Sequence, residues 1–127
     1  MIEYERVAPG MEKWHMNRDG AQPWPFHPVL HRFTAPDPGD PHDHPWDFRS
    51  MVYRGSYVEE VYTVNAAGWW TMQLHTRRPG DIIEVKAEHI HRIVALPDGE
   101  CWTWAEYGPN RRTTMFYRFE PGPRILT

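Results

Sequence analysis

Short stretches of alternating apolar and polar residues, separated by clusters of proline, glycine and aspartate, fill the chain from residue 29 onwards. This alternation is typical of half-buried strands, because successive side chains of a strand point to opposite faces of the sheet. The turn clusters recur at roughly ten-residue intervals, the spacing found in β-sandwiches and barrels. The expected strands are Val29–Thr34, Trp46–Arg54, Ser56–Val64, Trp69–Thr76, Ile82–Val85, His89–Leu96, Cys101–Tyr107 and Thr114–Phe119.

The organisation expected from this pattern is a single all-β domain over residues 1–127, closed or nearly closed, with little helix. Gly55 separates two of the strands, so Trp46–Arg54 and Ser56–Val64 are expected to form a hairpin-like pair. Residues 1–28 show no sustained helical period and are expected to form an N-terminal extension or edge segment. Either a short helix or an edge strand fits Met11–Asn17. The barrel itself is expected over residues 29–119.

Composition and charge indicate the cellular compartment and the classes of partner to expect. The chain is 40% hydrophobic and 24% charged, and it has no apolar run long enough to cross a membrane as a helix. Its charged N-terminus lacks the apolar core of a signal peptide. The single cysteine, Cys101, cannot form an internal disulfide, which fits a reducing cytoplasm. A net charge of -3 gives no electrostatic reason to bind nucleic acid. We therefore expect a cytoplasmic protein without nucleic-acid or membrane partners.

Histidine is the candidate for chemistry, because the chain has eight histidines and imidazole is the commonest transition-metal ligand. His42 and His44 follow a turn cluster, and residues two apart in an extended segment share a face. His89 and His91 repeat the pattern on a distant strand. A lone His-x-His pair is more commonly a polar surface feature. The spacing around the two pairs therefore decides between a surface and a metal site.

That spacing resembles the two sequence motifs of the cupin superfamily. His42 and His44 fill the paired histidine positions of the first motif, and Gly55 fills its final glycine. Gly80 and His91 fill the glycine and histidine positions of the second motif. The resemblance spans most of the expected strands. It implies a double-stranded β-helix, or jelly-roll barrel, in which His42, His44 and His91 hold one divalent transition metal.

One departure from the motifs bears on the ligands. Phe48 stands where most metal cupins have a glutamate ligand, and phenylalanine cannot bind a metal. Two interpretations remain: a site of three histidines, or recruitment of Asp47 through a β-bulge. Strand alternation points Asp47 away from the face used by Phe48, which favours three histidines.

The implied function follows from this ligand set. Three neutral imidazoles leave the charge of a divalent ion uncompensated and leave coordination positions open on iron. By resemblance we expect a mononuclear non-haem Fe²⁺ oxygenase or dioxygenase acting on a small organic substrate. Zn²⁺, Ni²⁺ or Mn²⁺ would also accept such a site, which would then suit non-oxidative lyase or isomerase chemistry. A non-catalytic, ligand-binding cupin is a third interpretation. Small cupins often dimerise, so a homodimer is also expected.

Three further residues are candidates for catalysis. An inward Arg32 or Arg49 would anchor a carboxylate or phosphate, although solvent-facing positions are commoner for strand arginines. Either His31 or Arg32 is expected to face the barrel interior. Tyr53 offers a phenol for proton transfer, as do Tyr57 and Tyr62, although packing is the commoner use of strand tyrosines. Glu59-Glu60 is expected to be a solvated hairpin edge.

Overall fold

The computed structural model describes residues 2–16, 27–119 and 125–126, and this part of the chain contains strands and no helix. The all-β prediction is confirmed. No helix in the described ranges is long and apolar enough to cross a membrane. In chain order the strands are β1 (Ile2–Ala8), β2 (Met11–Met16), β3 (His27–Phe33), β4 (Phe48–Gly55), β5 (Tyr57–Val64), β6 (Trp70–Arg77), β7 (Ile82–Val85), β8 (Ile90–Ala95), β9 (Cys101–Tyr107), β10 (Arg118–Phe119) and β11 (Ile125–Leu126).

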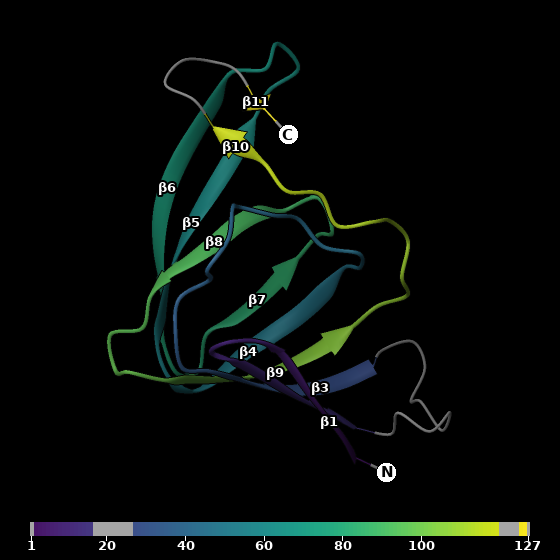
Figure 1. Ribbon diagram of the computed structural model, residues 1–127, viewed down its shortest axis with the longest axis vertical. Helices are drawn as coiled ribbons and strands as arrows, with labels where there is room; N and C mark the ends of the chain where they lie inside the picture. The colour runs from purple at the N-terminus through teal and green to yellow at the C-terminus, as the bar shows by residue number, and fades with distance from the viewer. Residues whose placement is uncertain (1, 17–26, 120–124, 127) are drawn as a thin grey trace.

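The strands form two main antiparallel sheets. The larger sheet has the order β1-β2-β3-β9-β4-β7, and the smaller has the order β6-β5-β8. In Figure 1 the short β10-β11 pair lies beside the ends of β5 and β6, far from β1. Long-range pairing dominates the larger sheet, because β3 pairs with β9 along its whole length, from His27 opposite Tyr107 to Phe33 opposite Cys101.

Gly55 is where the chain passes from one sheet to the other. Strand β4, which ends at Gly55, pairs with β7 and β9, whereas β5 pairs with β6 and β8. The prediction of a hairpin-like pair across Gly55 is therefore wrong. The residue has a φ of 74°, and a Cβ atom there would lie 2.2 Å from the carbonyl oxygen of Glu100. Only glycine fits this crossing without strain.

The N-terminal segment extends the larger sheet. Strands β1 and β2 form an antiparallel hairpin, and β2 also pairs with β3, which leaves β1 as one of the two edge strands of this sheet. The strand alternative for Met11–Asn17 is thus the one found over Met11–Met16, while Asn17 lies outside the described residues. The expected strand Thr114–Phe119 is mostly irregular, with β10 at its end and an isolated bridge at Phe116.

The core lies between the two sheets. One cluster takes one side chain from each of five strands, namely Phe33, Val52, Tyr57, Ile93 and Cys101. A second cluster, nearer the other end of β9, consists of Val29, Ala105 and Tyr107. Every second residue of β9 is buried, as alternation requires for a strand with one face on the core. The same inward faces line the pocket described below.

Candidate metal centre

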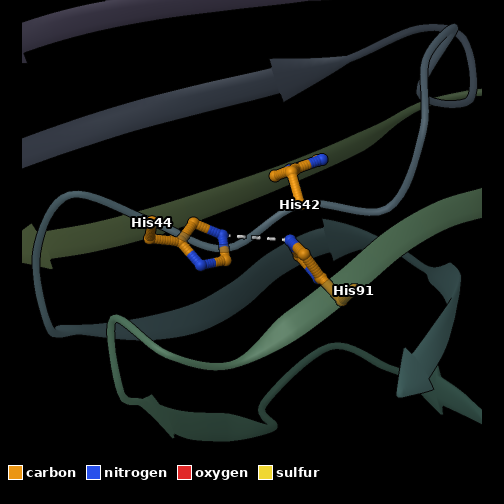
Figure 2. A group of neighbouring side chains, drawn as sticks. All are labelled: His42, His44 and His91. Carbon is orange, nitrogen blue, oxygen red and sulfur yellow. Dashed lines mark hydrogen bonds between the residues drawn. The ribbon is translucent and has the colours of Figure 1, made fainter. Parts of the chain in front are cut away.

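Two separate segments bring three histidines together. His42 and His44 lie on the connection between β3 and β4, and His91 lies on β8. Figure 2 shows the His44 and His91 side chains directed at each other, with His42 beside them. One ring nitrogen from each residue lies within 4.8 Å of the others. The structure thus brings together the three histidines that the sequence motifs select.

Backbone hydrogen bonds hold the His-x-His segment in place. His42 and His91 exchange two N–H···O=C bonds of 3.0 Å each, which makes them a hydrogen-bonded antiparallel pair. The amide of Asp43 donates to the carbonyl of Met115 at 3.0 Å, and that of His44 donates to Ala87 at 2.8 Å. Three successive amides are therefore tied to three different segments, which fixes the direction of both imidazoles.

The side chain of Asp43 ties the same segment to the C-terminal part of the chain. Its carboxylate is 1% exposed and accepts hydrogen bonds from the Met115 amide and the Tyr117 hydroxyl, each at 2.7 Å. Arg112 completes the set with a 2.9 Å ion pair. Because all of these partners stabilise the carboxylate where it lies, Asp43 supports the loop and does not join the histidine cluster.

The distance between the ring nitrogens of His44 and His91 suits a metal ion. His44 Nε2 and His91 Nε2 are 3.1 Å apart. Two nitrogens bound about 2.1 Å from one ion, at roughly 90–110° to each other, would be separated by about 3.0–3.4 Å. His44 Nδ1 is buried and has no hydrogen-bond partner among the described residues.

Burial keeps two of the candidate ligands, His42 and His44, neutral. It lowers the pKa of His44 to about 2, and the neighbouring His91, His42 and His89 rings lower it further. Burial and the neighbouring His91 also lower the pKa of His42. A neutral imidazole offers a lone pair to a metal, whereas a protonated one does not. His42 and His44 are thus in the protonation state that metal binding needs near neutral pH.

Glu59 is the carboxylate nearest to the cluster, and sequence reasoning missed it. The prediction of a solvated edge is wrong for this residue, which is 2% exposed and faces inward from β5. Its Oε1 atom lies 2.8 Å from His91 Nδ1 and 3.4 Å from His89 Nε2, and its Oε2 atom accepts from Arg77 Nε at 2.8 Å. Burial alone would raise the pKa of Glu59, but the hydrogen bonds from His89, His91 and Arg77 lower it. Glu59 is therefore an ionised partner of His91.

Phe48 and Asp47 occupy the two positions where a fourth ligand was considered. The Phe48 ring packs edge-on against His44, with 5.1 Å between ring centroids. The Asp47 carboxylate accepts from the Ala87 amide at 2.8 Å and from Arg111 at 2.7 Å, and it is not part of the histidine cluster. Phe48 therefore supports the His44 ring, and Asp47 is bound elsewhere.

The three histidines line one pocket of about 300 Å³ between the sheets. Part of its wall is aromatic: Trp46 stacks on Tyr107 with 4.4 Å between ring centroids, and Phe48 and Tyr57 also line the pocket. Pockets of this size and character are typical of small-molecule sites. The histidine cluster is thus open to a small organic molecule.

The three candidate catalytic residues lie outside this pocket, and Arg32 and Arg49 take the outward positions that are commoner for strand arginines. Arg32 pairs with Glu100 at 3.0 Å, and Arg49 pairs with Glu84 at 3.1 Å. Tyr53 is 66% exposed. The physical reason is strand register: on β3 and β4 the inward positions fall on the alternate residues, so all three side chains point outwards.

Other polar groups line the pocket instead. His31, rather than Arg32, faces inward, and it lies beside Thr103 and Tyr107. Tyr57 lines the pocket where Tyr53 does not. Lys13, on β2, places its ammonium group 5.0 Å from the centroid of the Tyr107 ring. The alternation of residues along a strand identifies polar residues that line the pocket only when the inward face of that strand is already known.

Comparison with known proteins identifies the fold. No protein-family model and no curated protein match the chain. Among solved structures, the polyketide cyclase RemF from Streptomyces resistomycificus is similar, with 19% identity over 96% of this chain and 84% of that one and a TM-score of 0.62. A cupin-2 domain from Rhodospirillum rubrum has 12% identity over 91% and 72%, with a TM-score of 0.61. A Bacillus subtilis oxalate decarboxylase, described by its Mn(II) centres, has 13% identity over 90% and 29%, with a TM-score of 0.62.

These likenesses, together with the two antiparallel sheets, show that the chain has the cupin fold, a jelly roll of β-strands. The resemblance found in the sequence is thereby confirmed at the level of the fold. A histidine-rich site with the geometry to bind a metal lies in its pocket.

Proposed function

We propose that this protein is a metal-dependent cupin enzyme with one divalent ion held by His42, His44 and His91. The observation that carries the proposal is the convergence of three imidazole nitrogens within 4.8 Å of one another at the wall of a pocket between the sheets. Two of these histidines have lowered pKa values, which keeps their lone pairs available. The nitrogen spacing fits one ion better than it fits three unrelated packing histidines.

The reaction class we propose is oxygenation of a small organic molecule by mononuclear Fe²⁺. When bound, iron with three neutral ligands would supply redox chemistry and open coordination positions. The chain's own contribution is to orient the three imidazoles, to surround the substrate with aromatic walls and to limit the access of water. Of the three carboxylates that line the pocket, Asp43 and Glu59 are each engaged by an arginine, and Asp37 accepts a hydrogen bond from the Ile93 amide. The charge of the ion, together with the Lys13 ammonium at the same pocket, would favour an anionic substrate group, such as a carboxylate or enolate.

A second candidate is a non-oxidative lyase, isomerase or cyclase that uses Zn²⁺, Ni²⁺ or Mn²⁺ as a Lewis acid. The structural likeness to RemF, a polyketide cyclase, supports this candidate. The likeness to an enzyme with Mn(II) centres supports manganese as an alternative ion. In both candidates the histidine cluster is the same, and the need for dioxygen separates them.

The test is to measure bound metals by mass spectrometry in protein purified without a histidine tag or added metal. Apoprotein loaded with Fe²⁺ without oxygen would then be screened for oxygen uptake with small aromatic and aliphatic acids. We expect about one iron per chain and substrate-dependent oxygen uptake. Turnover of a substrate under nitrogen with another ion would favour the second candidate. Ligand binding that is the same without any metal would overturn both and leave a binding protein.

A further inference from the structure

Glu59, His89 and His91 form a second group of potential ligands next to the first. One ligand atom from each of the three lies within 4.8 Å of the others, and His91 is shared by both groups. The group allows two interpretations. It could hold a second ion, with His91 bridging the two ions through its two ring nitrogens. Alternatively, Glu59 could orient His91 for the single ion of the first group.

Arg77 decides between these interpretations. Its Nε atom lies 2.8 Å from Glu59 Oε2, and the Glu59 side chain is only 3% exposed. A buried carboxylate that already has a guanidinium partner has no net charge left to attract a divalent ion. Bridging would also require His91 to lose its last ring proton, because a metal on each nitrogen leaves no site for it. Both considerations argue against a second ion.

The proton on His91 follows from the chemistry of its partner. Glu59 Oε2 accepts from the Arg77 guanidinium at 2.8 Å, and a buried carboxylate paired with a guanidinium is ionised and can only accept hydrogen bonds. His91 Nδ1, 2.8 Å from Glu59 Oε1, must therefore be the donor. In a neutral imidazole the other nitrogen then carries the lone pair, and His91 Nε2 is the nitrogen that lies 3.1 Å from His44 Nε2.

We propose that Glu59, clamped by Arg77, is a positioning residue that holds His91 in the one neutral tautomer able to bind the metal. This inference rests on the proposed metal site and adds a carboxylate that the cupin motifs in this sequence do not include. A carboxylate behind a ligating histidine also makes its imidazole a stronger base. Loss of such a partner typically weakens metal binding about 10–100-fold.

Glu60 provides a matched control. It is the next residue on β5, so its side chain points to the opposite face of the sheet. Like Glu59 it is paired with an arginine, with Arg92 Nη2 at 2.7 Å, and it accepts from Tyr62 at 2.9 Å. It contacts no histidine among the described residues. Replacing Glu60 therefore removes a comparable ion pair without touching His91.

The first measurement is Zn²⁺ binding to apoprotein, by competition with a chromophoric chelator, for wild type, Glu59→Gln and Glu60→Gln. We expect one ion per chain in all three proteins, with affinity about 10–100-fold lower in Glu59→Gln and within about twofold of wild type in Glu60→Gln. Two ions per wild-type chain, with the second lost in both Glu59→Gln and His89→Ala, would overturn the proposal in favour of a bridged site. Unchanged affinity in Glu59→Gln would overturn it as well.

The second measurement is the imidazole ¹⁵N NMR spectrum of the apoprotein, which reports the tautomer directly. We expect wild-type His91 to carry its proton on Nδ1. In Glu59→Gln the amide NH₂ can donate to Nδ1, so the population protonated on Nε2 should rise. A wild-type His91 protonated on Nε2 would overturn the proposal even if the variant failed to fold. If wild type bound no metal, the proposed function would fail, while this spectrum would still test the role of Glu59.

Discussion

His31 and His91 line the same pocket, yet their surroundings differ. His31 is 6% exposed, and hydroxyl groups contact both of its ring nitrogens: Thr103 Oγ1 at 3.2 Å and the Tyr107 hydroxyl at 2.5 Å. His91 has a carboxylate partner on Nδ1 and directs Nε2 at His44. A histidine whose two nitrogens are both satisfied by the protein has nothing left to offer a metal.

The nature of the partners matters as much as their number. A hydroxyl group can donate or accept, so Thr103 and Tyr107 are compatible with either neutral tautomer of His31. The ionised Glu59 can only accept, which selects one tautomer of His91. Hydrogen-bond partners, and not burial or strand position, therefore separate a packing histidine from a candidate ligand in this fold.

The strongest test of the comparison replaces each histidine in turn. In His91→Ala we expect metal affinity to fall by more than about 100-fold, because one of three ligands is lost. In His31→Gln, which keeps a donor and an acceptor, we expect one bound ion per chain with affinity close to that of wild type. Equilibrium titration with Zn²⁺ checks both variants. A large loss of affinity in His31→Gln would show that the two histidines act together.

Removal of one partner of His31 should affect stability and leave metal binding unchanged. In Tyr107→Phe the buried His31 Nε2 loses its hydrogen-bond partner, and we expect the free energy of unfolding to fall by about 1–3 kcal/mol. Urea unfolding of the apoprotein measures this change, and a Zn²⁺ titration provides the control. Weakened zinc binding at unchanged stability would contradict the distinction between His31 as a packing residue and His91 as a metal ligand.

A smaller effect is expected in the pH dependence of stability. Burial holds the pKa of His31 well below its usual value, and the charges of Lys13 and His15 add to the effect. The unfolded chain therefore binds a proton below about pH 6.5 that the folded chain does not, so stability falls as the pH drops through that value.

Between pH 7.5 and 5.5, wild type should lose about 1 kcal/mol more of its unfolding free energy than His31→Gln. Urea unfolding of the two apoproteins at both pH values gives this difference directly. The contributions of the other histidines are the same in both proteins and cancel in the difference. Equal losses in the two proteins would mean that His31 titrates normally in the folded state.

The smallest effect is expected at Asp47. Its carboxylate is bound to Arg111 and to the Ala87 amide on the protein surface. Asp47→Asn should therefore leave metal affinity within about twofold of wild type, and loss of an exposed ion pair should cost at most about 1 kcal/mol of stability. A tenfold loss of affinity in the same Zn²⁺ titration would return Asp47 to the list of ligands.

Much of the fold could be predicted because it depends on local patterns. Strands β7 and β9 have the bounds that alternation and turn residues predict, and the spacing of His42, His44 and His91 predicts their convergence. The sheet to which each strand belongs could not be predicted. The passage of the chain from one sheet to the other at Gly55 depends on contacts with the distant Glu100.

The remaining site residues were missed because their roles depend on contacts between different strands. On β4 the inward positions are Phe48, Ser50 and Val52, whereas Tyr53 is outward, so an aromatic side chain alone does not identify the inward face. Glu59 meets His91 only through the pairing of β5 with β8, where Val61 lies opposite His91. The residues next to Glu59 in the sequence are a valine and a glutamate, and they do not indicate that Glu59 has a buried arginine partner.

The pairing of β3 with β9 has a consequence for how the protein folds. Residues 27–33 must meet residues 101–107 before the larger sheet can close, so most of the chain takes part in the slow step. The histidine centre joins the β3–β4 connection to β8 within the same closed structure. An ion that binds only there should lower the rate constant of unfolding and leave that of refolding almost unchanged. Metal supply would then act on the lifetime of the folded protein, and not on the speed of its formation.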